Sequence, residues 1–196
     1  MRILKPVLFF LCLAPLARLI LLGLWGDLGP NPIEFITRST GTWTLNFLCL
    51  TLCMSPLRWF TGWRFPIQLR RMIGLFCFFY ASLHFSIWFW LDQNFDLVAM
   101  WADVLKRPFI TAGFSAFILL IPLAATSNSL ALRYLRQRWG QLHRLVYLIA
   151  LIAIMHYFWH KAGKNDFDTV SIYAIIIFTL LAIRLPWLRA RLPSRT

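Results

Sequence analysis

The sequence predicts an all-α membrane protein, a bundle of six transmembrane helices with both termini in the cytoplasm. Three observations predict this fold class. Of the 196 residues, 60% are hydrophobic and only 14% are charged, and the mean hydropathy is +0.67, more apolar surface than a soluble domain of this size can bury. Apolar runs long enough to cross a bilayer recur along the whole chain, and acidic and basic residues are segregated between alternate loops. We therefore expect one integral-membrane domain over residues 1–196.

The predicted spans are apolar stretches close to the length at which a helix crosses about 30 Å of hydrocarbon. They cover residues 7–24, 43–60, 72–91, 109–126, 143–160 and 170–186. The first span follows Arg2 and Lys5 and lacks the small-residue cleavage site of a signal peptide, so we expect it to be retained. Pro15 and Pro122 lie inside the first and fourth spans, where a proline can kink a helix and make space for a ligand.

Loop charges orient these spans. Segments 58–71 and 133–144 carry only basic charges, as do both termini. The acidic residues all lie in the alternate loops: Asp27, Glu34, Asp92, Asp96, Asp103, Asp166 and Asp168. By the positive-inside rule, the termini and the Arg-rich loops lie in the cytoplasm and the acidic loops outside. The net charge of +13 is then an orientation signal, and we expect contact with membrane lipid and no binding to nucleic acid.

The loop before the fourth span contains a short amphipathic segment. Val98, Trp101 and Leu105 share one face of a possible helix, whereas Asp96 and Asp103 take another. We expect this segment to lie on the outer surface, either as a platform for a partner or as an interfacial helix.

The histidines are the functional candidates, because the sequence has no Gly-rich phosphate loop, no Ser/His/Asp arrangement and no C-x-x-C pair. An imidazole in hydrocarbon must find a partner, so an intramembrane histidine is a functional candidate. His84 lies 13 residues beyond Arg71. His156 lies 13 residues beyond His143, so both side chains reach about 20 Å along their helices. Two imidazoles at one level suit a bis-histidine haem, and we predict His84 and His156 as the axial ligands of its iron.

Other roles are open for these and neighbouring residues. Each histidine could instead donate a hydrogen bond to a neighbouring helix, and a zinc site is less expected because no acidic or thiolate residue lies at that level. His160, one turn beyond His156, is the rival ligand, although its boundary position favours a solvated role or contact with a haem propionate. Arg107 is a propionate partner or an ordinary flanking charge. Arg18 could pair with a propionate, a quinone or backbone carbonyls, or reach the interface.

A second site is predicted nearer the cytoplasm. At the level of His143, the third span carries Arg70 and Arg71 in place of a histidine. One histidine facing guanidinium groups suits an anionic cofactor, such as a flavin phosphate or haem propionates. His143 is therefore a possible second metal or cofactor site. The alternative is that the arginines bind lipid phosphate.

Four segments carry a resemblance to a known family: GTWTLNFLCLTLCMSPLR, LRRMIGLFCFFYASLH, KRPFITAGFSAFILLIPLAATS and RWGQLHRLVYLIALIAIMHYFW. In order and spacing they resemble the haem-binding membrane subunits of bacterial periplasmic methionine-sulfoxide reductase systems, within the ferric-reductase-like transmembrane group. The resemblance implies a protein of the bacterial inner membrane that binds haem b and FMN. It places the haem-associated histidines on His84, His143 and His156. The wider group has a second histidine on the third span, where Arg70 and Arg71 stand here, so the inner cofactor is not fixed.

The resemblance also implies a function. Electrons would pass from the quinone pool or a cytosolic flavin reductase, through the membrane, to a periplasmic molybdenum-containing reductase subunit that repairs oxidised methionines. The chain would then be an electron-transfer subunit with no catalytic residue of its own. The alternatives are a stand-alone membrane ferric or quinone reductase, a structural assembly factor and an ion-coupled transporter, although every Asp and Glu lies outside the predicted spans.

Overall fold

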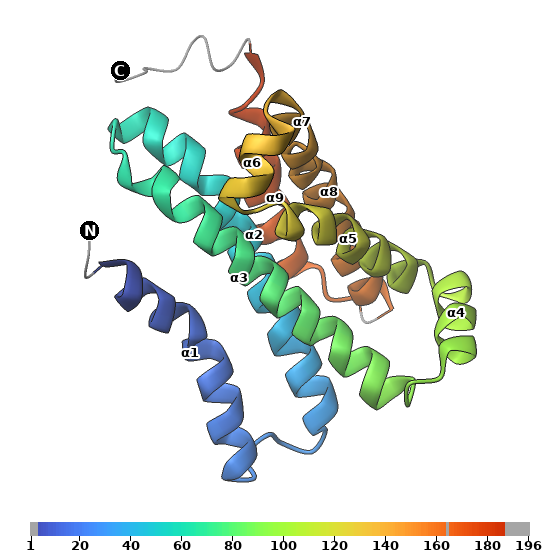
Figure 1. The fold of residues 1–196 in the computed structure, drawn as a ribbon. Coiled ribbons are helices and arrows are strands. Elements are labelled where there is room, and N and C mark those ends of the chain that lie inside the picture. Colours follow the sequence, from blue (N-terminus) through green and yellow to red (C-terminus); the bar gives the residue numbers. More distant parts are fainter. Residues whose placement is uncertain (1–3, 164, 187–196) are drawn as a thin grey trace.

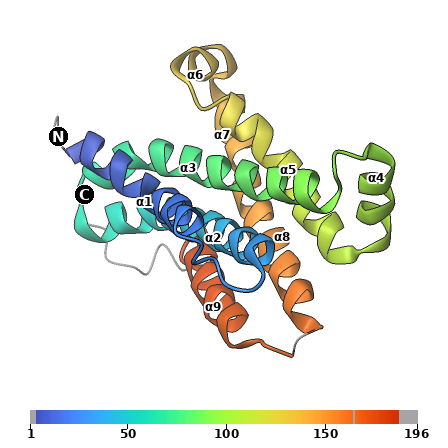
Figure 2. The ribbon, with the colours of Figure 1, turned by 90° about the horizontal axis from the view of Figure 1, so that it is seen from below.

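The computed structural model describes residues 4–163 and 165–186, which are mostly helical and contain no strand (Figure 1). The elements are α1 Leu4–Leu24, α2 Pro32–Thr61, α3 Phe65–Ile87, the π-helix η1 Trp88–Asp92, α4 Leu97–Lys106, α5 Pro108–Ala125, α6 Ser129–Leu135, α7 Gln137–His143, α8 Leu145–Ala162 and α9 Asp168–Ala182. Two helix pairs, α2 with α3 and α5 with α8, form the centre, and α9 packs on α2 and α8. Figure 2 shows α4 and α6 projecting at different edges of the bundle.

The two ends of the bundle differ in charge. The turn from α2 to α3 and the segment α6–α7 lie at the upper end in Figure 1 and carry many arginines; we name this the basic end. The loop from α1 to α2, helix α4 and the loop from α8 to α9 lie lower in the same view. These segments and the helix ends and turns next to them carry the acidic residues, and we name this the acidic end.

Local signals in the sequence explain where the helices begin and end. Asn31 caps α2 by accepting a hydrogen bond from the Glu34 N–H, and Pro32 occupies the first turn, where no N–H is needed. Gly62 ends α2 with a left-handed φ of 72°, which reverses the chain into α3. Asp96 caps α4 through the N–H groups of residues 98 and 99. The predicted short amphipathic helix is therefore present.

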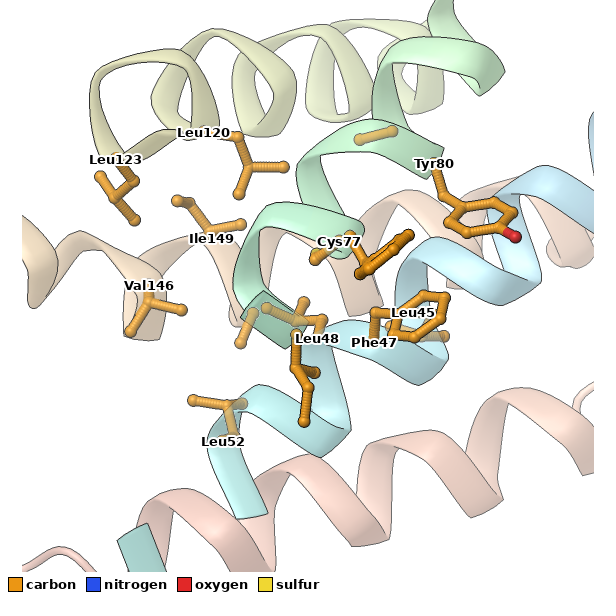
Figure 3. Close-up of a cluster of buried hydrophobic side chains, with 14 of the residues drawn as sticks. Leu45, Phe47, Leu48, Leu52, Cys77, Tyr80, Leu120, Leu123, Val146 and Ile149 are labelled. Atoms are coloured by element: carbon orange, nitrogen blue, oxygen red, sulfur yellow. The ribbon is translucent and has the colours of Figure 1, made fainter. Parts of the chain in front are cut away.

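The core lies between the two central helix pairs. Figure 3 shows apolar side chains of α2, α3, α5 and α8 pointing toward one another, among them Leu48, Leu52, Tyr80 and Ile149. Each of these four is at most 2% exposed. In contrast, many outward-facing side chains are apolar and exposed, as expected where the surroundings are hydrocarbon.

The structure supports a multi-pass membrane protein. Among the described residues, four helical stretches are long and apolar enough to span a bilayer: Leu4–Leu24, Phe65–Asp92, Pro108–Ala125 and Gln137–Ala162. Helix α9 is apolar but has only 15 residues. Helix α2 is the longest at 30 residues, and it contains Glu34, Arg38 and Arg58. A helix therefore lies at each of the predicted spans, while the number of membrane crossings stays a prediction.

Two features of the chain were not predicted. The Arg-rich segment before the fifth span forms the two short helices α6 and α7. The fifth span itself is interrupted at Arg144, which separates α7 from α8.

Candidate functional site

His84 and His156 come from different helix pairs, and their rings meet. His84 lies near the end of α3 and His156 lies in α8, with ring centroids 6.2 Å apart and ring planes at 77°. A bond from a metal to an imidazole nitrogen is about 2 Å long, and the nitrogen lies about 1 Å from the ring centre, so two imidazoles on opposite sides of one metal have centroids about 6 Å apart. The pair therefore has the separation needed to share one metal ion.

A backbone carbonyl holds the Nδ1 atom of each ring. Nδ1 of His84 is 2.9 Å from the Thr37 carbonyl oxygen in α2, and Nδ1 of His156 is 2.6 Å from the Phe109 carbonyl oxygen in α5. Because a carbonyl only accepts, Nδ1 is the protonated nitrogen in both rings and Nε2 keeps its lone pair. This is the tautomer of a histidine that binds a metal through Nε2 and is oriented through Nδ1.

A cavity of about 690 Å³ surrounds the pair, which is within the range of cofactor sites. Its wall is largely apolar and aromatic, with contributions from Leu45, Leu48, Phe85, Phe114, Phe117, Leu120 and Ile149. Among the described residues, no group of three or more His, Cys, Asp or Glu side chains could hold a metal ion. Two imidazoles in an apolar cavity fit the axial sites of a metalloporphyrin, whose ring supplies the other ligands.

Basic side chains line the cavity toward the acidic end. Arg38 of α2, Arg107 before α5 and Lys161 of α8 contribute to its lining, and we name them the rim cations. Each forms an ion pair with a neighbouring carboxylate, from Glu34, Asp103 and Asp166 respectively. Cations from three segments at one side of an apolar cavity could bind the carboxylates of a cofactor. Sequence reasoning identified Arg107 and missed the other two.

His160 lines the same cavity one helical turn beyond His156. Its ring centroid is 5.7 Å from that of Phe109, which in turn is 6.2 Å from that of His156. Phe109 therefore packs against both histidines of α8. The ring centroid of His156 lies 6.2 Å from that of His84. This geometry favours His156 over His160 as the second ligand of a metal bound to His84.

The predicted inner site is arranged differently. His143 ends α7, and its ring stacks on Trp139 with a centroid distance of 3.8 Å. Its Nδ1 lies 3.1 Å from the Trp139 carbonyl oxygen, and its Nε2 lies 3.5 Å from the Ser127 hydroxyl. His143 is not part of the lining of the large cavity.

Arg70 and Arg71, the two arginines predicted to face His143, have different surroundings. Arg70 donates a hydrogen bond to the Ser55 hydroxyl at 3.3 Å. Arg71 lines a separate cavity of about 210 Å³ that also includes Lys5 of α1. Arg18 lies exposed on α1 and does not contribute to the large cavity. A cofactor at the basic end would thus meet Arg70 and Arg71 on different sides of α3.

Two glycines at the site were missed by sequence reasoning. Gly41 of α2 and Gly113 of α5 both line the cavity and lie directly against the rings of His84 and His156. The available signal was spacing: the carbonyl that accepts from each histidine lies 47 residues before it, and a glycine follows that carbonyl residue by four positions in both cases.

Comparison with known proteins defines the class first. The long apolar helices are those of an integral-membrane protein, and residues 40–154 match the family model described as "Ferric reductase like transmembrane component". The matched range includes both glycines and His84, and it ends just before His156. No solved structure gives a significant match.

Curated relatives define the family more narrowly. A protein of Herminiimonas arsenicoxydans is 54% identical over 95% of this chain and 86% of its own length. Proteins of Ralstonia nicotianae and Rhodospirillum rubrum are 52% and 45% identical, over 95% and 99% of this chain and 87% and 93% of their own lengths. All three are named "Protein-methionine-sulfoxide reductase heme-binding subunit MsrQ". The chain belongs to this family.

Proposed function

We propose that this protein is a transmembrane electron-transfer subunit that holds one haem b between His84 and His156. The observation that carries the proposal is the 6.2 Å separation of the two rings inside a cavity of about 690 Å³. The names of the relatives support it, because they describe haem-binding subunits of a methionine-sulfoxide reductase.

Bound haem supplies a one-electron redox centre whose potential depends on its axial ligands and surroundings. The residues of this chain would orient and enclose the haem. The Thr37 and Phe109 carbonyls orient the imidazoles, the apolar wall excludes water, and the rim cations, which contribute to the cavity lining, would bind the propionate carboxylates. Substrate chemistry is then expected on a partner subunit.

We further propose an orientation and partners. Both termini and the basic end face the cytoplasm in a six-span arrangement within the bacterial inner membrane, by the positive-inside rule. Electrons enter from the quinone pool or a cytosolic flavin reductase. They leave at the acidic end, near the rim cations, to a periplasmic molybdenum-containing methionine-sulfoxide reductase subunit that repairs oxidised proteins.

A second cofactor, FMN, is a separate proposal based on the family resemblance. Its phosphate would need cations, and Arg70 lies close to the basic end beside Ser55. His143, stacked on Trp139, is an aromatic surface at that end on which a flavin ring could pack. Flavin content of the purified chain decides this point independently of the haem.

The test is a cofactor assay on the detergent-purified chain. We expect about one haem b per polypeptide by pyridine haemochrome, with the low-spin absorbance of two imidazole ligands. A chain that is free of porphyrin when iron is plentiful would contradict the proposal. The match to the ferric reductase model favours one alternative, a stand-alone ferric or quinone reductase; reduction of ferric chelates without any periplasmic subunit would support that alternative.

A further inference from the structure

His84 and His156 are each held in the same way against the helix that packs on their own. We call each of these two positions, a backbone carbonyl followed four residues later by a glycine, a seat. In each case the accepting carbonyl belongs to the residue four positions before a glycine, Thr37 before Gly41 and Phe109 before Gly113. The same local arrangement is therefore built twice, once in α2 with α3 and once in α5 with α8.

Each glycine lies against the Nδ1–Cε1 edge of its ring. A Cβ added at Gly113 would lie 2.8 Å from both Nδ1 and Cε1 of His156. A Cβ added at Gly41 would lie 3.1 Å from Cε1 and 3.2 Å from Nδ1 of His84. Non-bonded carbon atoms are normally separated by about 3.5 Å or more. Each imidazole thus occupies space that the Cβ of any other residue would take.

Helix geometry explains why the glycine and the carbonyl go together. In an α-helix, the carbonyl of residue i faces the N–H of residue i+4, and its second lone pair can accept another donor. A side chain at i+4 would stand beside that carbonyl. Glycine leaves it uncovered, so one missing side chain both admits the ring and exposes the acceptor for Nδ1.

We propose that Gly41 and Gly113 are positioning residues for the two metal ligands. Each opens one helix face so that the histidine of the facing helix lies against it, with Nδ1 bound to a carbonyl one turn earlier and Nε2 left for the metal. The two seats are equivalent halves of a repeated helix-pair unit. The inference rests on the proposed function for the identity of the bound group, whereas the seats themselves do not require it.

The proposal predicts that replacing Gly41 or Gly113 with alanine has the opposite effect to a glycine-to-alanine substitution elsewhere in a helix. Glycine to alanine within a helix ordinarily stabilises the protein, and this is expected at two control positions. A Cβ at Gly74 of α3 would make an ordinary contact with Thr51 at 3.6 Å, and one at Gly140 of α7 would meet nothing within 4 Å. At Gly41 and Gly113, alanine should be damaging, and more so at Gly113, where the contact is shorter.

The first measurement is the absorbance and electron paramagnetic resonance spectrum of the detergent-purified chain. Gly113→Ala is expected to lose at least half of the low-spin signal per polypeptide, and Gly41→Ala to lose less. Gly74→Ala and Gly140→Ala should match the wild type. A wild-type spectrum in Gly113→Ala, or equal losses in all four variants, would overturn the proposal.

A second measurement does not depend on haem. In the cofactor-free chain, Gly113→Ala should lower the thermal unfolding midpoint, but it should have no such effect in a His156→Ala background, because the ring that it strikes is gone. The same lowering in both backgrounds would refute the seat. A wild-type chain without haem would refute the proposed function, while this cycle would still decide whether the seat exists.

Discussion

Each rim cation is paired with a carboxylate of this chain, and each also lines the largely apolar cavity, where it could bind a carboxylate of the cofactor. We expect Arg38→Gln and Lys161→Gln each to weaken haem retention up to about fivefold, because a partly exposed ion pair contributes about 0.2–1 kcal/mol. Haem loss to apomyoglobin measures this. Lys106→Gln is the control, since Lys106 is exposed and lies outside the cavity. Equal rates for all three variants would show that the rim does not contact the cofactor.

At the residue scale, counting along helices predicted which histidines share a level. The rings of His84 and His156 do meet. The count compared depths along the helices only, and it did not consider the neighbour four residues earlier within α7, Trp139, on which the His143 ring stacks. The equal spacing of Gly41 and Gly113 before the two histidines can be read from the sequence, but the faces of two apolar helices that touch cannot, so the glycine seats were not predicted.

Helices α2 and α9 are joined by Arg184, which follows α9. Its guanidinium donates to the carbonyls of Leu180 and Leu52. The Leu52 carbonyl lacks a helical partner because the residue four positions later is Pro56, which has no N–H. Arg184 thus supplies the hydrogen bond that the proline cannot make.

This contact gives a double-mutant prediction. Arg184→Met should cost less stability in a Pro56→Ala background than in the wild type, by about 1 kcal/mol, because the alanine N–H then satisfies the Leu52 carbonyl. Chemical unfolding in detergent measures the coupling. Additive costs would mean that Arg184 does not compensate for Pro56.

Helix α1 is held to α3 by Tyr80. The Tyr80 hydroxyl accepts from the Leu16 N–H at 3.1 Å and donates to the Cys12 carbonyl at 2.9 Å, and so it is inserted between two groups of α1 that a regular helix would pair. Tyr80→Phe should therefore destabilise the docking of α1 by about 1–3 kcal/mol.

Hydrogen exchange of the α1 amides measures this effect, and faster exchange around residues 12–16 is expected. Tyr134→Phe is the control, because Tyr134 is 89% exposed. Unchanged exchange in Tyr80→Phe would show that α1 is held by its other contacts.

At the element scale, hydropathy located a helix at each predicted span, and spacing located α4. Hydropathy did not locate α6 and α7, because the short Arg-rich segment that forms them has no long apolar run. Asn128 does carry a helix start signal, since its side chain accepts from the Ala131 N–H.

At the scale of the whole molecule, charge segregation predicts six crossings with both termini in the cytoplasm. A fluorescent protein fused to the C-terminus should therefore fluoresce, and alkaline phosphatase fused there should be inactive. Alkaline phosphatase fused after Gly163, between α8 and α9, should be active because that loop lies at the acidic end. The reverse pattern would invert the orientation, and activity at both positions would mean that α9 does not cross the membrane.

Haem content of single histidine variants tests the central claim most directly. Measured by pyridine haemochrome on the detergent-purified chain, His84→Ala and His156→Ala should each lose most of the low-spin haem, whereas His160→Ala should lose much less. If His84→Ala and His156→Ala both keep full haem content, the two rings do not share an iron and the proposed electron path is wrong.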